Sequence, residues 1–192
     1  MKPNVTKKYQ HVLETLSEQK ILEVLFRWPE KEFSLTDLAK EARVAKVHAA
    51  RIVNKLCKLY VIKVEKLSKI WRISANRDLF FIRKKMLNNL NLLFFGTDIV
   101  EFLNEHFKNP KAIVLFGSFR TGEDISTSDI DIAIETDTKE YNIIRLNELA
   151  DMEKFLGRKI QLHLFDRKII DVHVFNNIAN GIVLSGFLEV GI

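Results

Sequence analysis

Cysteine is nearly absent from this chain, which has Cys57 alone among its 192 residues. A lone cysteine cannot form a disulfide within the chain, so we expect the protein to reside in the reducing cytoplasm. Cys57 and five histidines are also too few for us to expect a structural zinc site. No apolar run approaches the ~20 residues of a membrane span, and the first ten residues lack the apolar stretch of a signal peptide. The composition therefore predicts no membrane association.

Proline and glycine are also scarce, with three and seven residues, while hydrophobic residues make up 47% of the chain. These values are typical of a soluble globular protein and exclude collagen and wholesale disorder. The net charge of +5 hides an asymmetry. Residues 1–76 contain 16 Lys and Arg against 8 Asp and Glu, whereas residues 111–192 contain 9 against 13. This contrast predicts two modules with different partners, although a charge distribution can also serve solubility alone.

The N-terminal part predicts three helices. Apolar residues recur at helical spacing over 17–28, and Pro29 ends that run. Ser34 and Asp37 have the spacing of a capping box, which predicts a second helix over 35–41. A third helix is predicted over 46–59, because its apolar residues form one stripe and its basic residues lie on the opposite side.

Two short alternating segments, 61–64 and 70–73, then predict a β-hairpin. This order of elements over residues 17–75 resembles the winged-helix family. The resemblance implies that the helix at 46–58 enters a major groove while the hairpin touches phosphates. The nucleic-acid-binding candidates are Lys46, His48, Arg51, Lys55, Lys58, Lys66 and Lys69. The alternative is a winged helix that serves protein interaction or dimerisation.

Residues 77–108 form a strongly apolar connector with one glycine, Gly96. The pattern predicts one helix before Gly96 and a second helix capped by Thr97. Because the apolar faces of these helices need a cover, we expect a homodimer. Part of the second helix could instead belong to the C-terminal core.

The strongest pattern lies at residues 112–135. Residues 112–116 (AIVLF) form an apolar run typical of a strand buried on both faces, and Gly117 and Ser118 follow it directly. Asp129 and Asp131 stand at i and i+2 of a second predicted strand, so both carboxylates share one face. Two such carboxylates suit Mg²⁺ or Mn²⁺, and Gly-Ser at a strand end suits a phosphate. Together they predict phosphoryl or nucleotidyl transfer.

The segment LFGSFRTGEDISTSDIDIAIE, residues 115–135, resembles the minimal nucleotidyltransferases of the DNA-polymerase-β superfamily. The shared signature is Gly-Ser, a later Gly, here Gly122, and Ser-Asp-x-Asp at residues 128–131. The resemblance implies that Asp129 and Asp131 bind metal and that Gly117 and Ser118 hold a nucleoside triphosphate.

Two positions depart from that pattern. The family often has a basic residue at the place of Thr121, whereas here Arg120 precedes it. The family also supplies a third carboxylate on a later strand, which we place at 159–165 after a helix from about 139 to 156. The matching residue is Gln161, a neutral side chain, and either His163 or Asp166 is a candidate to replace the missing acid. Gln161 and His163 could also simply line a degenerate pocket.

We therefore predict a multidomain protein of α + α/β class: a winged helix (1–76), a helical connector (77–108) and a nucleotidyltransferase domain (109–192) with a small mixed sheet flanked by helices. The expected activity is metal-dependent transfer of AMP from ATP, or of another nucleoside monophosphate, to a protein or nucleic acid, as in antitoxins that modify a partner toxin. The alternative is a nucleotide-sensing, non-catalytic DNA-binding regulator. The predicted catalytic residues are Asp129, Asp131 and His163, and the predicted nucleotide-binding residues are Gly117, Ser118, Arg120, Ser128 and Gln161.

Overall fold

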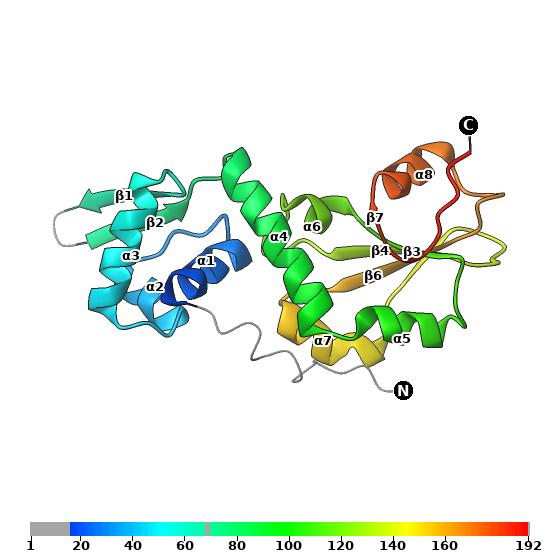
Figure 1. Cartoon of the computed structure of the whole chain (residues 1–192), viewed down its shortest axis with the longest axis horizontal. Helices are drawn as coiled ribbons and strands as arrows, with labels where there is room; N and C mark the ends of the chain where they lie inside the picture. The colour runs from blue at the N-terminus through cyan, green and yellow to red at the C-terminus, as the bar shows by residue number, and fades with distance from the viewer. Residues whose placement is uncertain (1–15, 68–69, 192) are drawn as a thin grey trace. The chain divides into compact units, whose positions relative to one another are not determined.

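The computed structural model describes residues 16–67 and 70–191 of the chain (Figure 1). These residues form two compact units, an N-terminal unit that ends at Asn88 and a C-terminal unit that begins at Asn89. The division falls inside one helix, α4 (Leu79–Gly96). The three-part division expected from the sequence stays a prediction.

The N-terminal unit contains three helices followed by a β-hairpin, in the order expected from the sequence. The elements are α1 (Ser17–Arg27), α2 (Leu35–Glu41), α3 (Lys46–Lys58), β1 (Ile62–Leu67) and β2 (Ile70–Ala75). The apolar stripes of the helices meet in one core, in which Ile21, Leu38 and Val53 are fully buried. The hairpin closes this core, because Ile73 of β2 is also fully buried and pairs with Phe33 in an isolated bridge.

Local chemistry explains where α2 begins. The Ser34 hydroxyl accepts a hydrogen bond from the Asp37 amide at 3.1 Å, as the capping box predicted. The same hydroxyl donates to the Asp37 carboxylate at 2.6 Å. The predicted cap of the next connector helix is wrong. The Thr97 hydroxyl donates to the Leu93 carbonyl at 2.6 Å, at the end of α4, and α5 (Ile99–His106) has no side-chain cap.

The C-terminal unit is built on a five-stranded mixed sheet. Its strands are β3 (Ala112–Phe116), β4 (Ile130–Glu135), β5 (Asn142–Ile144), β6 (Ile160–Phe165) and β7 (Ile182–Gly186), in the order β5-β6-β4-β3-β7. Only β4 and β6 run parallel among these described strands; the other neighbours are antiparallel. All five residues of β3 are buried, as its uninterrupted apolar run predicted.

Helices cover both faces of this sheet (Figure 1). The larger core contains Phe102 of α5 and Met152 of α7 (Ala150–Leu156) against Ile132 of β4. The smaller core contains Ile178 of α8 (Val172–Ala179) against Val114 and Ala133. The two faces of β4 alternate accordingly: its isoleucines enter the larger core, which leaves Asp131 on the opposite face.

The helix predicted over residues 139–156 is wrong in its first half. The chain there forms the short edge strand β5, then a 3₁₀ turn (Asn147–Leu149), and only then α7. Strand β5 pairs antiparallel with β6, so tertiary pairing rather than local periodicity decides its structure. No helix among the described residues combines the length and the apolar character needed to cross a bilayer.

Candidate active site

The site begins where strand β3 ends. Gly117 follows Phe116 and opens the short helix α6 (Gly117–Thr121) with a φ of +72°, a conformation that favours glycine. A Cβ atom at this position would overlap Oδ2 of Asp131. Glycine is therefore required twice over, by its backbone angle and by the approach of this turn to the carboxylate.

Two carboxylates stand at the start of strand β4, and one of them, Asp131, faces this turn. Asp129 directly precedes the strand and Asp131 is its second residue, so their side chains share one face. Asp131 pairs with Phe116 of β3 on one side and with Gln161 of β6 on the other. The sheet therefore brings the Gly-Ser turn, the carboxylates and Gln161 together.

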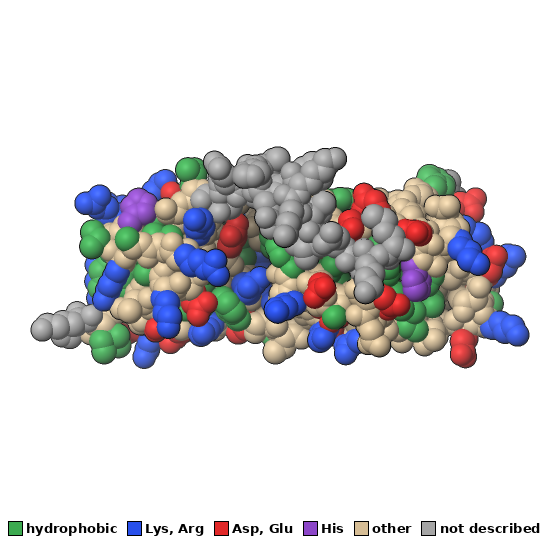
Figure 2. Space-filling model, turned by 90° about the horizontal axis from the view of Figure 1, so that it is seen from below, with side chains coloured by type: hydrophobic (Ala, Val, Ile, Leu, Met, Phe, Trp, Pro, Cys, Tyr) green, Lys and Arg blue, Asp and Glu red, His purple; other side chains and the backbone are tan. Residues whose placement is uncertain are grey.

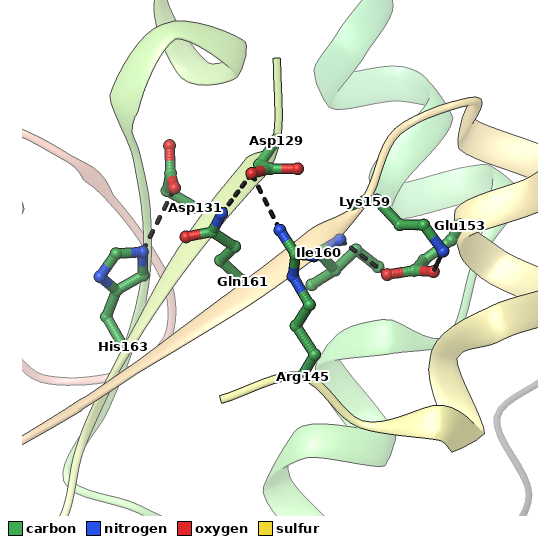
Figure 3. Close-up of polar contacts among 8 residues, drawn as sticks. All are labelled: Asp129, Asp131, Arg145, Glu153, Lys159, Ile160, Gln161 and His163. Atoms are coloured by element: carbon green, nitrogen blue, oxygen red, sulfur yellow. Dashed lines mark hydrogen bonds and ion pairs between the residues drawn. The ribbon is translucent and has the colours of Figure 1, made fainter. Parts of the chain in front are cut away.

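Asp129 is contacted by two side chains from later in the sequence (Figure 3). The Gln161 amide nitrogen donates to Oδ2 of Asp129. The same oxygen forms an ion pair with Nη2 of Arg145 at 3.2 Å. The Arg145 side chain is 55% exposed, so little packing holds it and a competing cation can displace it.

Asp131 is contacted by His163. The Nε2 atom of His163 lies 3.2 Å from Oδ1 of Asp131 (Figure 3). The other ring nitrogen, Nδ1, forms a hydrogen bond with the Tyr141 hydroxyl. Phe116 packs edge-on against the imidazole, with ring centroids 4.8 Å apart. Burial raises the pKa of Tyr141, and the negative charge of Asp131 raises it further.

The loop that leads to Asp129 is held by buried polar contacts. Asp124 is buried and pairs with Arg158, which donates from Nη2 at 3.2 Å and from Nε at 3.3 Å. The Asn89 amide donates to the other Asp124 oxygen at 2.9 Å. The Ser128 hydroxyl accepts from the Ile125 amide at 3.0 Å, so this side chain stabilises the turn. Its predicted contact with a nucleotide stays a prediction.

Arg120 extends from α6, and its Nε atom is buried. Within the described residues, this atom has no hydrogen-bond partner. A buried N–H without a partner is costly, and an anion beside α6 would satisfy it. The predicted phosphate contact of Arg120 stays a prediction.

A hollow of about 490 Å³ adjoins the outer side of Asp129. Its lining joins the loop before β4, helix α7 and the start of β6: Ser126, Thr127, Ser128, Asp129, Ala150, Glu153, Lys154, Gly157, Arg158 and Lys159. Glu153 organises this wall, because its carboxylate accepts from Lys159 Nζ at 2.6 Å and from the Ile160 amide at 2.9 Å (Figure 3). The size is in the range of small-ligand sites, and three of the lining residues are cationic.

The donor set fits a Mg²⁺ or Mn²⁺ ion that arrives with a triphosphate. Such ions need only one or two protein carboxylates when phosphate oxygens and water supply the other ligands. Asp129 and Asp131 provide two, and the backbone of Gly117 closely approaches Oδ2 of Asp131. A complete cage of protein ligands is absent, since no three described His, Cys, Asp or Glu residues form a metal-binding group. Rotation of the Gln161 amide would add a neutral oxygen.

The predicted nucleic-acid contacts lie in the N-terminal unit. Six of the seven candidates are exposed: Lys46, His48, Arg51, Lys55, Lys58 and Lys66. Lys69 lies outside the described residues. Two of the six already have partners, since Lys55 pairs with Glu18 at 2.7 Å and Lys66 lies 4.3 Å from the centre of the Trp71 ring. Figure 2 shows lysine and arginine side chains spread over the visible face of this unit.

Two site residues, Tyr141 and Arg145, were not predicted from the sequence. Both lie in the segment around β5 that was predicted as helix, and neither belongs to a recognisable motif. The only signal that could have found them was the assignment of 142–144 as an edge strand next to β6, which would have placed them beside His163 and Asp129.

Comparison with known proteins identifies the kind of domain that the sequence pattern resembles. Residues 97–183 match the family described as nucleotidyltransferase domain. The chain is also similar to the "Putative protein adenylyltransferase" of Methanocaldococcus jannaschii, with 39% identity over 74 residues. The aligned region covers 34% of this chain and 74% of the archaeal protein.

Proposed function

The chain belongs to the nucleotidyltransferase domain family, and we propose that it transfers AMP from ATP to a hydroxyl group of a protein or nucleic acid. The single observation that carries this proposal is the position of Asp131 against the turn at Gly117, with Asp129 two residues before it on the same face. The name of the archaeal relative, a protein adenylyltransferase, supports ATP as the donor and a protein as the acceptor.

The residues divide the work as follows. The turn at Gly117 and Ser118 receives the triphosphate, and Asp129 and Asp131 hold its divalent cation. When bound there, such a cation would neutralise negative charge that develops on the α-phosphate. The acceptor oxygen bonds to the α-phosphorus, the bond from that phosphorus to pyrophosphate breaks, and the acceptor proton leaves to solvent or a nearby group.

Arg145 has two successive partners in this scheme. It occupies the Asp129 oxygen in the absence of a cation, and the two cations compete for that oxygen. Once displaced, the exposed guanidinium stays beside the site and is suited to a phosphate oxygen. Arg145 thus neutralises Asp129 in the resting protein and the triphosphate in the loaded one.

The hollow beside Asp129 is the proposed acceptor site. It adjoins a metal-binding carboxylate and contains three hydroxyl-bearing residues together with Lys154 and Lys159. An acceptor with a negative group next to its hydroxyl would suit these cations. A partner toxin as that acceptor stays a prediction, as does the homodimer.

For the N-terminal unit we propose a winged helix that binds nucleic acid through α3 and the hairpin. Its three helices and hairpin support this assignment, and the exposed basic residues of α3 supply the phosphate-neutralising charge. Arg51 is the strongest candidate for a phosphate contact, because it is exposed on α3. No described acidic side chain pairs with Arg51, whereas Lys55 pairs with Glu18.

The transfer proposal is tested by incubating the full chain with α-labelled ATP, Mg²⁺ or Mn²⁺, and cell extract. We expect metal-dependent labelling of an acceptor, and its loss together with metal-dependent ATP binding in the Asp129→Asn, Asp131→Asn double variant. Asp137→Asn, at a carboxylate whose side chain is 88% exposed, is the matched control. Undiminished Mn²⁺-dependent ATP binding by the double variant would show that the site is elsewhere. ATP binding without any transfer would favour the nucleotide-sensing regulator.

A further inference from the structure

We propose that Tyr141 and His163 form a positioning relay for Asp131, in which His163 donates a hydrogen bond to the carboxylate instead of accepting the acceptor's proton. This inference rests on the proposed function, because Asp131 is taken as a ligand of the divalent cation. Tyr141 is then a positioning residue, and His163 does not replace the missing acid as a proton acceptor.

The relay is a continuous line of contacts across three parts of the sheet. Tyr141 directly precedes edge strand β5, His163 lies in β6, and Asp131 lies in the neighbouring strand β4. The Tyr141 hydroxyl meets Nδ1 of His163, and Nε2 of the same ring lies 3.2 Å from Oδ1 of Asp131. The His163 side chain is 8% exposed, and Phe116 packs on its ring, so the imidazole has little freedom to turn away.

Hydrogen-bond chemistry determines which nitrogen holds the proton. An ionised carboxylate only accepts, so the nitrogen that faces Asp131, Nε2, must carry the hydrogen in the neutral ring. Nδ1 then has a lone pair and accepts from Tyr141. The Tyr141 hydroxyl can donate to that lone pair, because a tyrosine phenol is protonated at neutral pH.

This arrangement leaves His163 with no free lone pair for a substrate proton. Nδ1 accepts from Tyr141 on the side of the ring away from Asp131, and Nε2 already bears its hydrogen. To act as a base, His163 would have to give up its hydrogen bonds with Tyr141 and Asp131. As a hydrogen-bond donor to Asp131, it keeps both. The structure therefore favours orientation of Asp131 over proton transfer.

The two oxygens of Asp131 consequently have different surroundings. Oδ1 is held by His163, while Oδ2 faces the turn at Gly117, where a Cβ atom would overlap it. Holding Oδ1 from the side therefore directs Oδ2 toward the place where the triphosphate is proposed to bind. Hydrogen bonds from neighbouring groups that orient a metal ligand commonly contribute 10- to 100-fold to metal affinity.

The test measures the apparent dissociation constant of Mg²⁺ in the binding of a non-hydrolysable ATP analogue to the full chain. It also measures the rate of transfer where an acceptor is found. We compare Tyr141→Phe, His163→Ala and His163→Gln with the wild type. Tyr141→Phe removes only a hydroxyl, and His163→Gln keeps an N–H donor near the place of Nε2 without an imidazole. Tyr60→Phe is the matched control, because Tyr60 is 77% exposed in the N-terminal unit.

We expect Tyr141→Phe and His163→Ala to raise the apparent Mg²⁺ dissociation constant about 10-fold or more. The constant of His163→Gln should stay within about threefold of the wild-type value. The ¹⁵N spectrum of the wild type should show His163 as the Nε2–H tautomer, assigned by its loss in His163→Gln. In Tyr141→Phe that resonance should shift toward a mixture of tautomers. Thermal unfolding of each variant identifies any that fails to fold.

Three results would overturn the relay. An unchanged Mg²⁺ dissociation constant in folded Tyr141→Phe would show that Tyr141 is not part of the relay. Equal loss of transfer in His163→Gln and His163→Ala, with metal binding intact in both, would make His163 the base. An Nδ1–H tautomer in the wild type would contradict the assigned donor. A wild-type chain that binds no analogue with Mg²⁺ would instead overturn the proposed function, and the relay with it.

Discussion

Replacement of Gln161 by aspartate tests the site most directly, because it restores the acid expected from the family resemblance. In the structure the Gln161 amide donates to Asp129, and Gln161 pairs with Asp131 across the parallel β4–β6 ladder. An aspartate there would lose this hydrogen bond and would place a third carboxylate against the other two. The substitution should therefore destabilise the folded protein without a divalent cation, and this loss of stability should vanish or reverse when the cation is bound.

The magnitude follows from the charges. Two like charges about 4 Å apart repel by about 1 kcal/mol in bulk water and by about 4 kcal/mol at an effective dielectric constant of about 20. Asp129 and Asp131 are 27% and 24% exposed, so the true value should lie between these limits. Without a cation, Gln161→Asp should thus lose about 1–4 kcal/mol of unfolding free energy, which lowers the melting temperature by several degrees. Arg145 offsets part of this repulsion.

The assay is thermal unfolding with EDTA and with saturating Mg²⁺ and ATP analogue, with Gln161→Asn as the control of equal size and no charge. With EDTA, the aspartate variant should melt below the asparagine variant. With ligand, the difference should vanish or reverse, because tighter binding of the ligand stabilises the folded state more, with the logarithm of the affinity. Metal-dependent transfer should rise at least several-fold, since a positioned base contributes about 10²–10⁴-fold. Identical melting of both variants in both conditions would show that position 161 does not face the carboxylates.

Three further outcomes follow from particular contacts. Arg145→Ala should lower the dissociation constant of Mn²⁺, measured without nucleotide, up to about fivefold, because an exposed ion pair is worth up to about 1 kcal/mol; a raised constant in that titration would contradict the competition with metal. Glu135→Gln should be more stable than the wild type at pH 7 by about 1 kcal/mol, as Glu135 is buried and Oε2 has no partner within the described residues. Burial raises the pKa of Glu135, so its charged form destabilises the fold and the difference should shrink as pH falls below that pKa; denaturant titrations showing a constant difference would refute this. Arg51→Ala should weaken binding to duplex DNA and reduce the log–log salt slope by about 0.9, while Asp129→Asn should leave both unchanged; a flat salt dependence of the wild type would indicate a protein-interaction module.

Much of the N-terminal unit could be predicted from local patterns. The three helices lie within a few residues of their predicted ranges, because their apolar periodicity agrees with the burial that the fold provides. The start of α2 follows from one side chain, Ser34, and its own neighbours. Thr97 shows the limit of such reasoning. Its sequence context suited a cap, but its hydroxyl found the Leu93 carbonyl within reach at the end of α4.

The sequence by itself determined the part of the site that is local in the chain. Asp129 and Asp131 share a face because a strand has a period of two, and Gly117 follows a buried strand in one continuous segment. The placement of Gln161 near them was predicted through the family resemblance, and the register that pairs it with Asp131 agrees. The predicted role of Gln161 in nucleotide binding stays a prediction.

Only the tertiary structure decided which groups surround those carboxylates. Tyr141 and Arg145 reach the site because β5 joins the sheet edge next to β6, a pairing for which the segment itself has no strong pattern. The partner of each ring nitrogen of His163 likewise depends on two neighbouring strands rather than on its own. Local sequence determines a residue's face and spacing, whereas strand register and edge pairing determine its neighbours, and it is those neighbours that decide whether an imidazole donates a proton or accepts one.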